Sequence, residues 1–145
     1  MKRFYARAGG LVLAILCAGA HAEARGPTPN RLLVTRTKDN LNNTGAPPFH
    51  AAVSDPAVAK LYADISALPP FPAGPMNCPN DMGIRYHLDF YAGASLALAA
   101  DYQPTGCVSV RLRDGTVKSD PAGSFKTDFE HALGFASDRQ LFGLQ

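Results

Sequence analysis

Residues 84–103, IRYHLDFYAGASLALAADYQ, decide the fold of this chain. Apolar and polar side chains alternate along the first half, with Ile84, Tyr86, Leu88 and Phe90 on one side and Arg85, His87, Asp89 and Tyr91 on the other. A period of two predicts a strand with one buried and one solvated face. Ala92-Gly93-Ala94 then predicts a tight turn, and the alternation continues through Leu96, Leu98, Ala100 and Tyr102. The stretch therefore predicts the central antiparallel hairpin of a sheet.

Shorter strands are predicted on both sides of this hairpin. Residues 31–37, RLLVTRT, are rich in Leu, Val and Thr, and residues 49–53, FHAAV, place their apolar side chains on one face. After the hairpin, Val108, Val110 and Leu112 alternate with polar residues, and Asp114-Gly115 is a two-residue hairpin signal that leads into residues 116–118.

Two helices are predicted from apolar spacing and from their flanking residues. The first contains Val58, Leu61, Tyr62, Ile65 and Leu68, and the second contains Phe125, Phe129, Ala132 and Leu133. Each follows an Asp-Pro pair, Asp55-Pro56 or Asp120-Pro121, which is typical of a carboxylate cap followed by a proline in the first turn. Pro69-Pro70 ends the first helix, and Gly134 is expected to end the second.

These elements predict an α+β fold in the order β-β-α-β-β-β-α. We expect an antiparallel sheet of about five strands with the two helices covering one face. We expect residues 31–145 to form a single domain, preceded by a flexible lead-in at residues 23–30, and Leu141, Phe142 and Leu144 to fold back onto it.

Residues 1–22, MKRFYARAGGLVLAILCAGAHA, are typical of an export signal. Three basic residues precede a short apolar run, and Ala20-His21-Ala22 is a small-x-small cleavage site. Lipid attachment at Cys17 is the alternative, but a lipobox needs a small residue before its cysteine and Leu16 stands there. The sequence therefore predicts cleavage between Ala22 and Glu23 and a secreted or periplasmic protein.

Cleavage leaves 123 residues with 11 basic and 12 acidic side chains, so the formal charge changes from +2 to about −1. This balance argues against a nucleic-acid or anionic-membrane partner, which needs a basic excess. After the signal, no apolar run approaches the roughly 20 residues of a membrane span. The chain carries no G-x-S-x-G motif and no phosphate-binding glycine loop. We therefore expect a non-enzymatic protein without a cofactor.

Cys78 and Cys107 are the two cysteines of the exported chain. An even count in an oxidising compartment predicts a disulfide, here closing a loop of about 30 residues. A redox or metal pair is the alternative, but the C-x-x-C spacing is absent.

Polar residues of the central strand suggest a second kind of site. His87 and Asp89 have the spacing with which two side chains bind one metal or form an acid-base pair. Arg85, Arg111, Arg113 and Lys118 are expected on the same face, where they would bind an anion or be neutralised by Asp89 and Asp101. We favour the neutralised, salt-bridged face.

Residues 69–81, PPFPAGPMNCPND, are dense in proline and predict an extended segment, either a spacer or a rigid exposed recognition loop. We call them the proline-rich segment.

The stretch from Cys78 to Cys107 resembles the subtilisin-inhibitor-like family of secreted bacterial serine-protease inhibitors. The matching features are Cys78-Pro79, the aromatic strand at residues 86–90, the turn at Gly93 and the closing Cys107. The resemblance implies a reactive bond just after the Cys-Pro pair, which makes Asn80 and Asp81 the candidate binding residues and an extracytoplasmic serine protease the candidate partner. A further disulfide of that family has no counterpart here. The contrasting hypothesis is a small exported enzyme or metal-binding protein that uses the face of His87 and Asp89.

Overall fold

The computed structural model describes residues 27–38, 47–78 and 80–144. The predicted signal peptide, its cleavage site between Ala22 and Glu23, and most of the lead-in lie outside these residues. The stretch that decides the fold forms strands β3 (Ile84–Ala92) and β4 (Ser95–Gln103), which pair antiparallel across a two-residue turn. Gly93 in this turn has φ 62°, a left-handed conformation that glycine adopts without steric cost.

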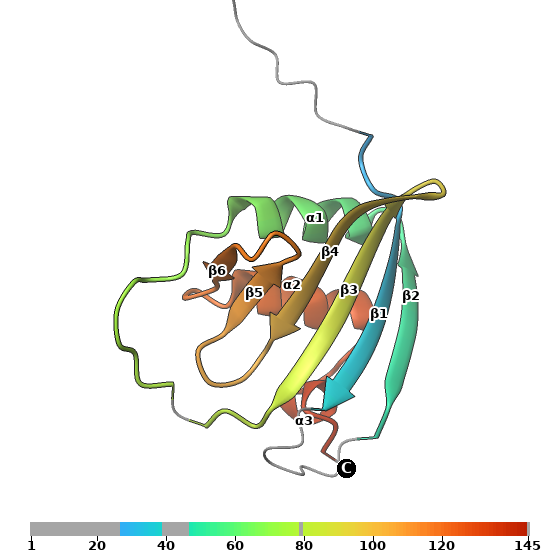
Figure 1. The fold of residues 1–145 in the computed structure, drawn as a ribbon. Coiled ribbons are helices and arrows are strands. Elements are labelled where there is room, and N and C mark those ends of the chain that lie inside the picture. The colour runs from blue at the N-terminus through green and yellow to red at the C-terminus, as the bar shows by residue number, and fades with distance from the viewer. Residues whose placement is uncertain (1–26, 39–46, 79, 145) are drawn as a thin grey trace, which may run out of the picture.

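The hairpin lies at the centre of a six-stranded antiparallel sheet in the order β2-β1-β3-β4-β5-β6 (Figure 1). The other strands are β1 (Arg31–Lys38), β2 (Phe49–Ser54), β5 (Ser109–Leu112) and β6 (Val117–Ser119). The sequence predicted about five strands. The sixth, β6, has only three residues; the hairpin signal at Asp114-Gly115 indicated its place, but it was not counted as a separate strand.

Helices α1 (Ala57–Ala67) and α2 (Ser124–Leu133) cover one face of this sheet, and a short helix, α3 (Asp138–Leu141), follows (Figure 1). The α+β class and the helical cover are confirmed. The predicted order lacked β6 and α3, because the four residues of α3 make a single turn without a periodic signal.

The core lies between the helices and the sheet. Ile84, Tyr86, Leu88 and Phe90 are each at most 1% exposed, as their alternation predicted. They share one apolar cluster with Val58, Leu61, Ile65, Phe125 and Phe129. Aromatic rings meet edge to face in this cluster, with centroids of Tyr102 and Phe125 4.9 Å apart. The helix-facing side of the sheet therefore carries the core of the domain.

The predicted alternation is wrong at the start of β4. The pairing register shifts between Phe90 and Tyr91, so that Phe90 lies opposite Leu98 while Tyr91 lies opposite Leu96. Ala97 is thus the extra residue of a β-bulge. Ser95 and Leu96, which precede it on β4, therefore point to the faces opposite to those that the alternation predicted. Leu96 is 42% exposed on the face away from the helices.

The two Asp-Pro pairs act differently from each other. Asp55-Pro56, a cis peptide, lies in a turn before α1, and the helix start has no side-chain cap. The prediction of an Asp55 cap is therefore wrong. Asp120 is buried, and its carboxylate accepts the Lys126 backbone N–H at 2.9 Å across a turn that separates it from α2. Asp120 thus caps α2 without being adjacent to it, and Gly134 ends α2 as predicted.

Residues near the C-terminus fold back onto the sheet, as expected. Leu141 is fully buried, and its carbonyl oxygen accepts the Tyr86 hydroxyl at 2.5 Å. The Arg36 guanidinium donates to the carbonyl oxygens of Pro47 and Gln140 and to the Tyr86 hydroxyl oxygen. Arg36 thereby fastens α3 to β1.

Candidate functional site

The proline-rich segment leaves the helical layer at a fixed point beside β6. The Ser119 N–H donates to the Pro69 carbonyl and the Phe71 N–H donates to the Val117 carbonyl, both at 2.9 Å. Lys118 lies between them and donates to the carbonyl oxygens of Ser66 and Leu68 at the end of α1. The expectation that Lys118 shares the polar sheet face is therefore wrong. Its ammonium group stabilises the start of the segment instead.

Residues 72–78 of the segment are all exposed. Figure 1 shows the chain swinging outward there, between the end of α1 and the start of β3. Met76 is 46% exposed, one of three large apolar side chains with such exposure among the described residues. The middle of the segment is therefore available to a partner.

The far end of the segment is fastened by the cysteine pair. Cys78 and Cys107 are joined, with Cα atoms 4.8 Å apart. This agrees with the predicted disulfide and links the segment to the connection between β4 and β5.

Asn80 and Asp81, the candidate binding residues, have different surroundings. Asn80 is exposed and has φ 59°, the left-handed region that Asn tolerates better than most residues. The Asp81 carboxylate accepts hydrogen bonds from the Gly83 N–H at 2.9 Å, from Gln103 Nε2 at 3.0 Å and from Thr105 Oγ1 at 3.3 Å. Asp81 therefore holds the chain in place, and Asn80 is the residue that faces outward.

Gly106 brings the connection between β4 and β5 close to this anchor. A Cβ atom at Gly106 would lie 2.9 Å from the Asp81 Cβ, and the glycine has φ 71°. Both facts require glycine at this position. Sequence reasoning did not find this contact with Asp81, because nothing in the sequence pairs residues 25 positions apart.

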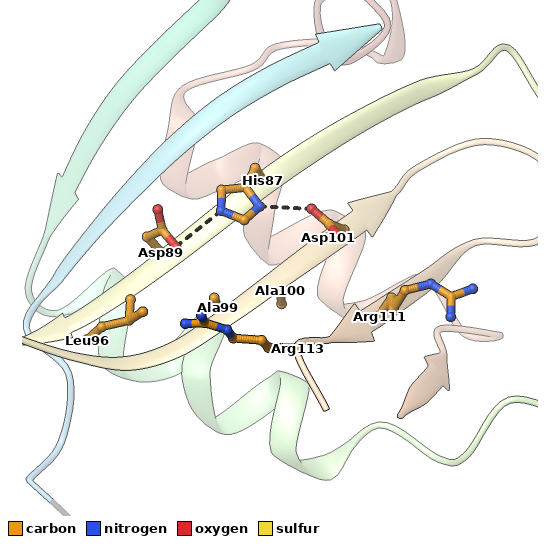
Figure 2. A pocket seen from close by; sticks show the side chains of 8 residues that line it. All are labelled: His87, Asp89, Leu96, Ala99, Ala100, Asp101, Arg111 and Arg113. Carbon is orange, nitrogen blue, oxygen red and sulfur yellow. Dashed lines mark hydrogen bonds and ion pairs between the residues drawn. The ribbon is translucent and has the colours of Figure 1, made fainter. Parts of the chain in front are cut away.

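The second candidate site is a hollow of about 350 Å³ on the sheet face away from the helices. We call it the open-face hollow. Its lining residues come from β3, from β4, from β5 and from the turn after β5: His87, Asp89, Leu96, Ala99, Ala100, Asp101, Arg111 and Arg113 (Figure 2).

His87 lies between two carboxylates in this hollow. Its Nδ1 is 2.8 Å from Asp101 Oδ1, and its Nε2 is 3.2 Å from Asp89 Oδ1 (Figure 2). Both ring nitrogens donate only in the imidazolium form. The hydrogen bond with Asp101 accordingly raises the pKa of His87, with Asp89 adding to the effect.

The arginines of the hollow are not neutralised as expected. Arg111 lies directly opposite Asp101 in the β4–β5 register, yet among the described residues neither Arg111 nor Arg113 forms an ion pair. Asp89 and Asp101 bond to His87 instead. Figure 2 shows Arg111 turned outward and Arg113 reaching over Ala99 toward Leu96. The predicted salt bridges are present on this face, but they run through His87 and not through Arg111 or Arg113.

The geometry does not favour the metal alternative. The two carboxylates take opposite ring nitrogens of His87, and no group of three His, Cys, Asp or Glu side chains in the described part of the chain is placed to hold a metal ion. The other two histidines of the described chain lie outside the hollow. His50 is on β2, with its Nδ1 3.3 Å from Thr35 Oγ1 on β1, and His131 is exposed on α2.

Comparison with family models, with curated proteins and with solved structures finds no match for this chain. None of the described helices is long and apolar enough to cross a membrane.

Proposed function

We propose that this chain is an exported, non-enzymatic binding protein of inhibitor-like design, whose recognition element is the proline-rich segment. The supporting observation is that residues 72–78 are exposed while both ends of the segment are fastened, by backbone hydrogen bonds to β6 at the start and by the disulfide and Asp81 at the end. A segment held in this way loses little conformational entropy when it binds, which favours affinity.

The cysteine pair supports an extracytoplasmic location. Disulfides persist in oxidising compartments and are rare in the cytosol. The predicted export signal at residues 1–22 gives the same location from an independent part of the sequence. The partner we propose is an extracytoplasmic protein such as a serine protease, which accommodates an extended peptide in its cleft.

Asn80 and Met76 are the side chains that we expect to contact this partner. Asn80 follows directly on the disulfide region, as the resemblance to subtilisin-inhibitor-like proteins implies, and Met76 is the large apolar side chain exposed on the segment. Asp81 contributes by holding Asn80 in place, since its carboxylate already accepts hydrogen bonds within the protein.

The test is a panel of a trypsin-like, a subtilisin-like and a glutamyl-specific protease, each incubated with the mature protein. Residual activity and complex formation by size exclusion are measured. We expect a complex with at least one protease that weakens about tenfold in Met76→Ala or Asn80→Ala, the loss typical of a central contact residue. Leu33→Ala is the matched control, because Leu33 is also a large apolar residue, 38% exposed, but lies on β1.

Two results would count against the proposal. One is the absence of a complex with every protease of the panel. The other is a complex that Met76→Ala, Asn80→Ala and reduction of the disulfide all leave unchanged, which would make the segment a spacer.

A further inference from the structure

The open-face hollow contains positive charge without a partner. A guanidinium is charged at every physiological pH and is most stable when a carboxylate or another anion accepts its hydrogen bonds. The Arg113 guanidinium has no such acceptor among the described residues, although the carboxylates of Asp89 and Asp101 line the same hollow. Both carboxylates bond to His87, so Arg113 is left available to an anion from outside.

The charge of the whole hollow has the sign that an anion requires. With His87 protonated, the lining carries three cations and two carboxylates, a net charge of +1. A cationic ligand would have to displace His87 from Asp89 or Asp101, whereas an anion meets Arg113 directly.

An apolar surface lies beside this guanidinium. The bulge at Ala97 turns Leu96 onto the open face, where it is 42% exposed, and Ala99 follows it on the same strand. In Figure 2 the Arg113 side chain extends over Ala99 toward Leu96. When the charged group of a ligand bonds to Arg113, the adjoining part of that ligand therefore lies against Leu96.

We propose that the open-face hollow binds a small monocarboxylate with a short apolar tail, the carboxylate pairing with Arg113 and the tail packing on Leu96 and Ala99. A volume of about 350 Å³ corresponds to roughly a dozen water molecules. That volume accommodates a carboxylate of about six carbons, and hexanoate is the probe of choice. This site is separate from the proline-rich segment and does not depend on the function proposed for it.

Protonation of His87 sets the net charge of the open-face hollow. Arg85 and Asp89 flank His87 on β3, Asp101 faces it from β4, Thr35 from β1 with His50 beyond it on β2, and Arg111 lies behind Asp101 on β5. When His87 loses its proton, one ring nitrogen stops donating and a carboxylate loses its cation. Arg111 lies directly opposite Asp101 in the β4–β5 register and can then pair with it, and the net charge of the hollow falls to zero.

The test measures binding of hexanoate to the mature protein by calorimetry and by NMR shifts of the Leu96 and Ala99 signals. We expect hexanoate to bind and hexylamine, its cationic counterpart, not to bind. Arg113→Gln should weaken hexanoate binding about tenfold or more, a typical loss for one charged contact. The matched control is Arg139→Gln, an equal change of charge at an exposed residue of α3.

Two further measurements separate the parts of the site. Affinity should rise from acetate to hexanoate in the native protein, and this gain should shrink in Leu96→Ala. Hexanoate binding should weaken as the pH rises through the titration of His87, and His87→Gln should abolish that dependence. Equal binding of hexanoate and hexylamine, or unchanged binding in a folded Arg113→Gln variant, would overturn the proposal.

Discussion

Truncation of Leu88 should destabilise the protein far more than truncation of Leu96, although both are leucines of the central hairpin. Leu88 is 0% exposed and lies in the core cluster. Leu88→Ala removes about three methylene equivalents, each contributing about 0.8 kcal/mol of transfer free energy. The cavity left in a closed core adds to this, so we expect a loss of about 3 to 4 kcal/mol, within the usual range of about 2 to 5.

Leu96 provides the matched comparison because the β-bulge places it on the open face. It is 42% exposed, so only part of its transfer free energy is at stake. Truncation there widens a hollow that water already reaches and leaves no closed cavity. Leu96→Ala should therefore lower the free energy of unfolding by about 1 kcal/mol or less.

Urea unfolding of both variants, with the disulfide intact, measures this difference. In thermal unfolding, about 3 kcal/mol corresponds to a drop in Tm of roughly 10 °C for a domain of this size. His87→Ala, next to Leu88 on the other face, serves as a control and should cost under about 1 kcal/mol. Similar losses in Leu88→Ala and Leu96→Ala would refute the bulge and the face assignment of the start of β4.

Replacing both Cys78 and Cys107 by Ala should lower the free energy of unfolding by about 3 to 4 kcal/mol in the chain-entropy model. Thiol titration of the unmutated protein under denaturing conditions checks the pairing, and two free thiols would contradict it. The raised pKa of His87 means that its pairing stabilises the fold fully below the usual pKa of 6.5, and that this contribution disappears as the pH rises through the folded-state value. Unfolding curves of the native protein and His87→Gln should therefore converge at alkaline pH, and a gap that widens there would reverse the sign. Intact mass of the exported protein should give an N-terminus at Glu23, whereas a lipidated Cys17 would exclude cleavage after Ala22.

The sequence predicted the parts of this fold that follow from local periodicity. The alternation from Ile84 to Phe90 identified the core face of β3 correctly, because each of these side chains interacts with the same helical layer. The prediction failed at Leu96, since a bulge depends on how two strands pair and leaves no periodic signal in one of them. The caps show the same limit: Asp55 and Asp120 stand in similar local sequences, yet only the Asp120 carboxylate reaches its helix.

The candidate site was predictable in its residue types but not in its pairing. His87 and Asp89 were identified from their spacing, and Arg111 and Arg113 from theirs. The pairing of carboxylates with cations depends on the strand register. This register places Asp101 opposite His87 on one side and Thr35 opposite it on the other. The role of Asp81 could not be predicted, because its partners Gln103 and Thr105 are more than 20 positions away.

The two faces of the sheet have different roles, and this difference explains where the proline-rich segment and the open-face hollow lie. The helix-facing side is occupied by side chains that must stay buried for the domain to be stable, so a polar or adaptable site there would cost stability directly. The open face and the connecting segments carry no such requirement. A chain of hydrogen bonds runs along this side: Gln103 donates to the Asp81 carboxylate, and Arg85, two residues before His87 on β3, donates to the side-chain oxygen of Gln103. The anchor of the proline-rich segment and the edge of the open-face hollow are therefore held by the same pair of strands, β3 and β4, whose position the core fixes from behind.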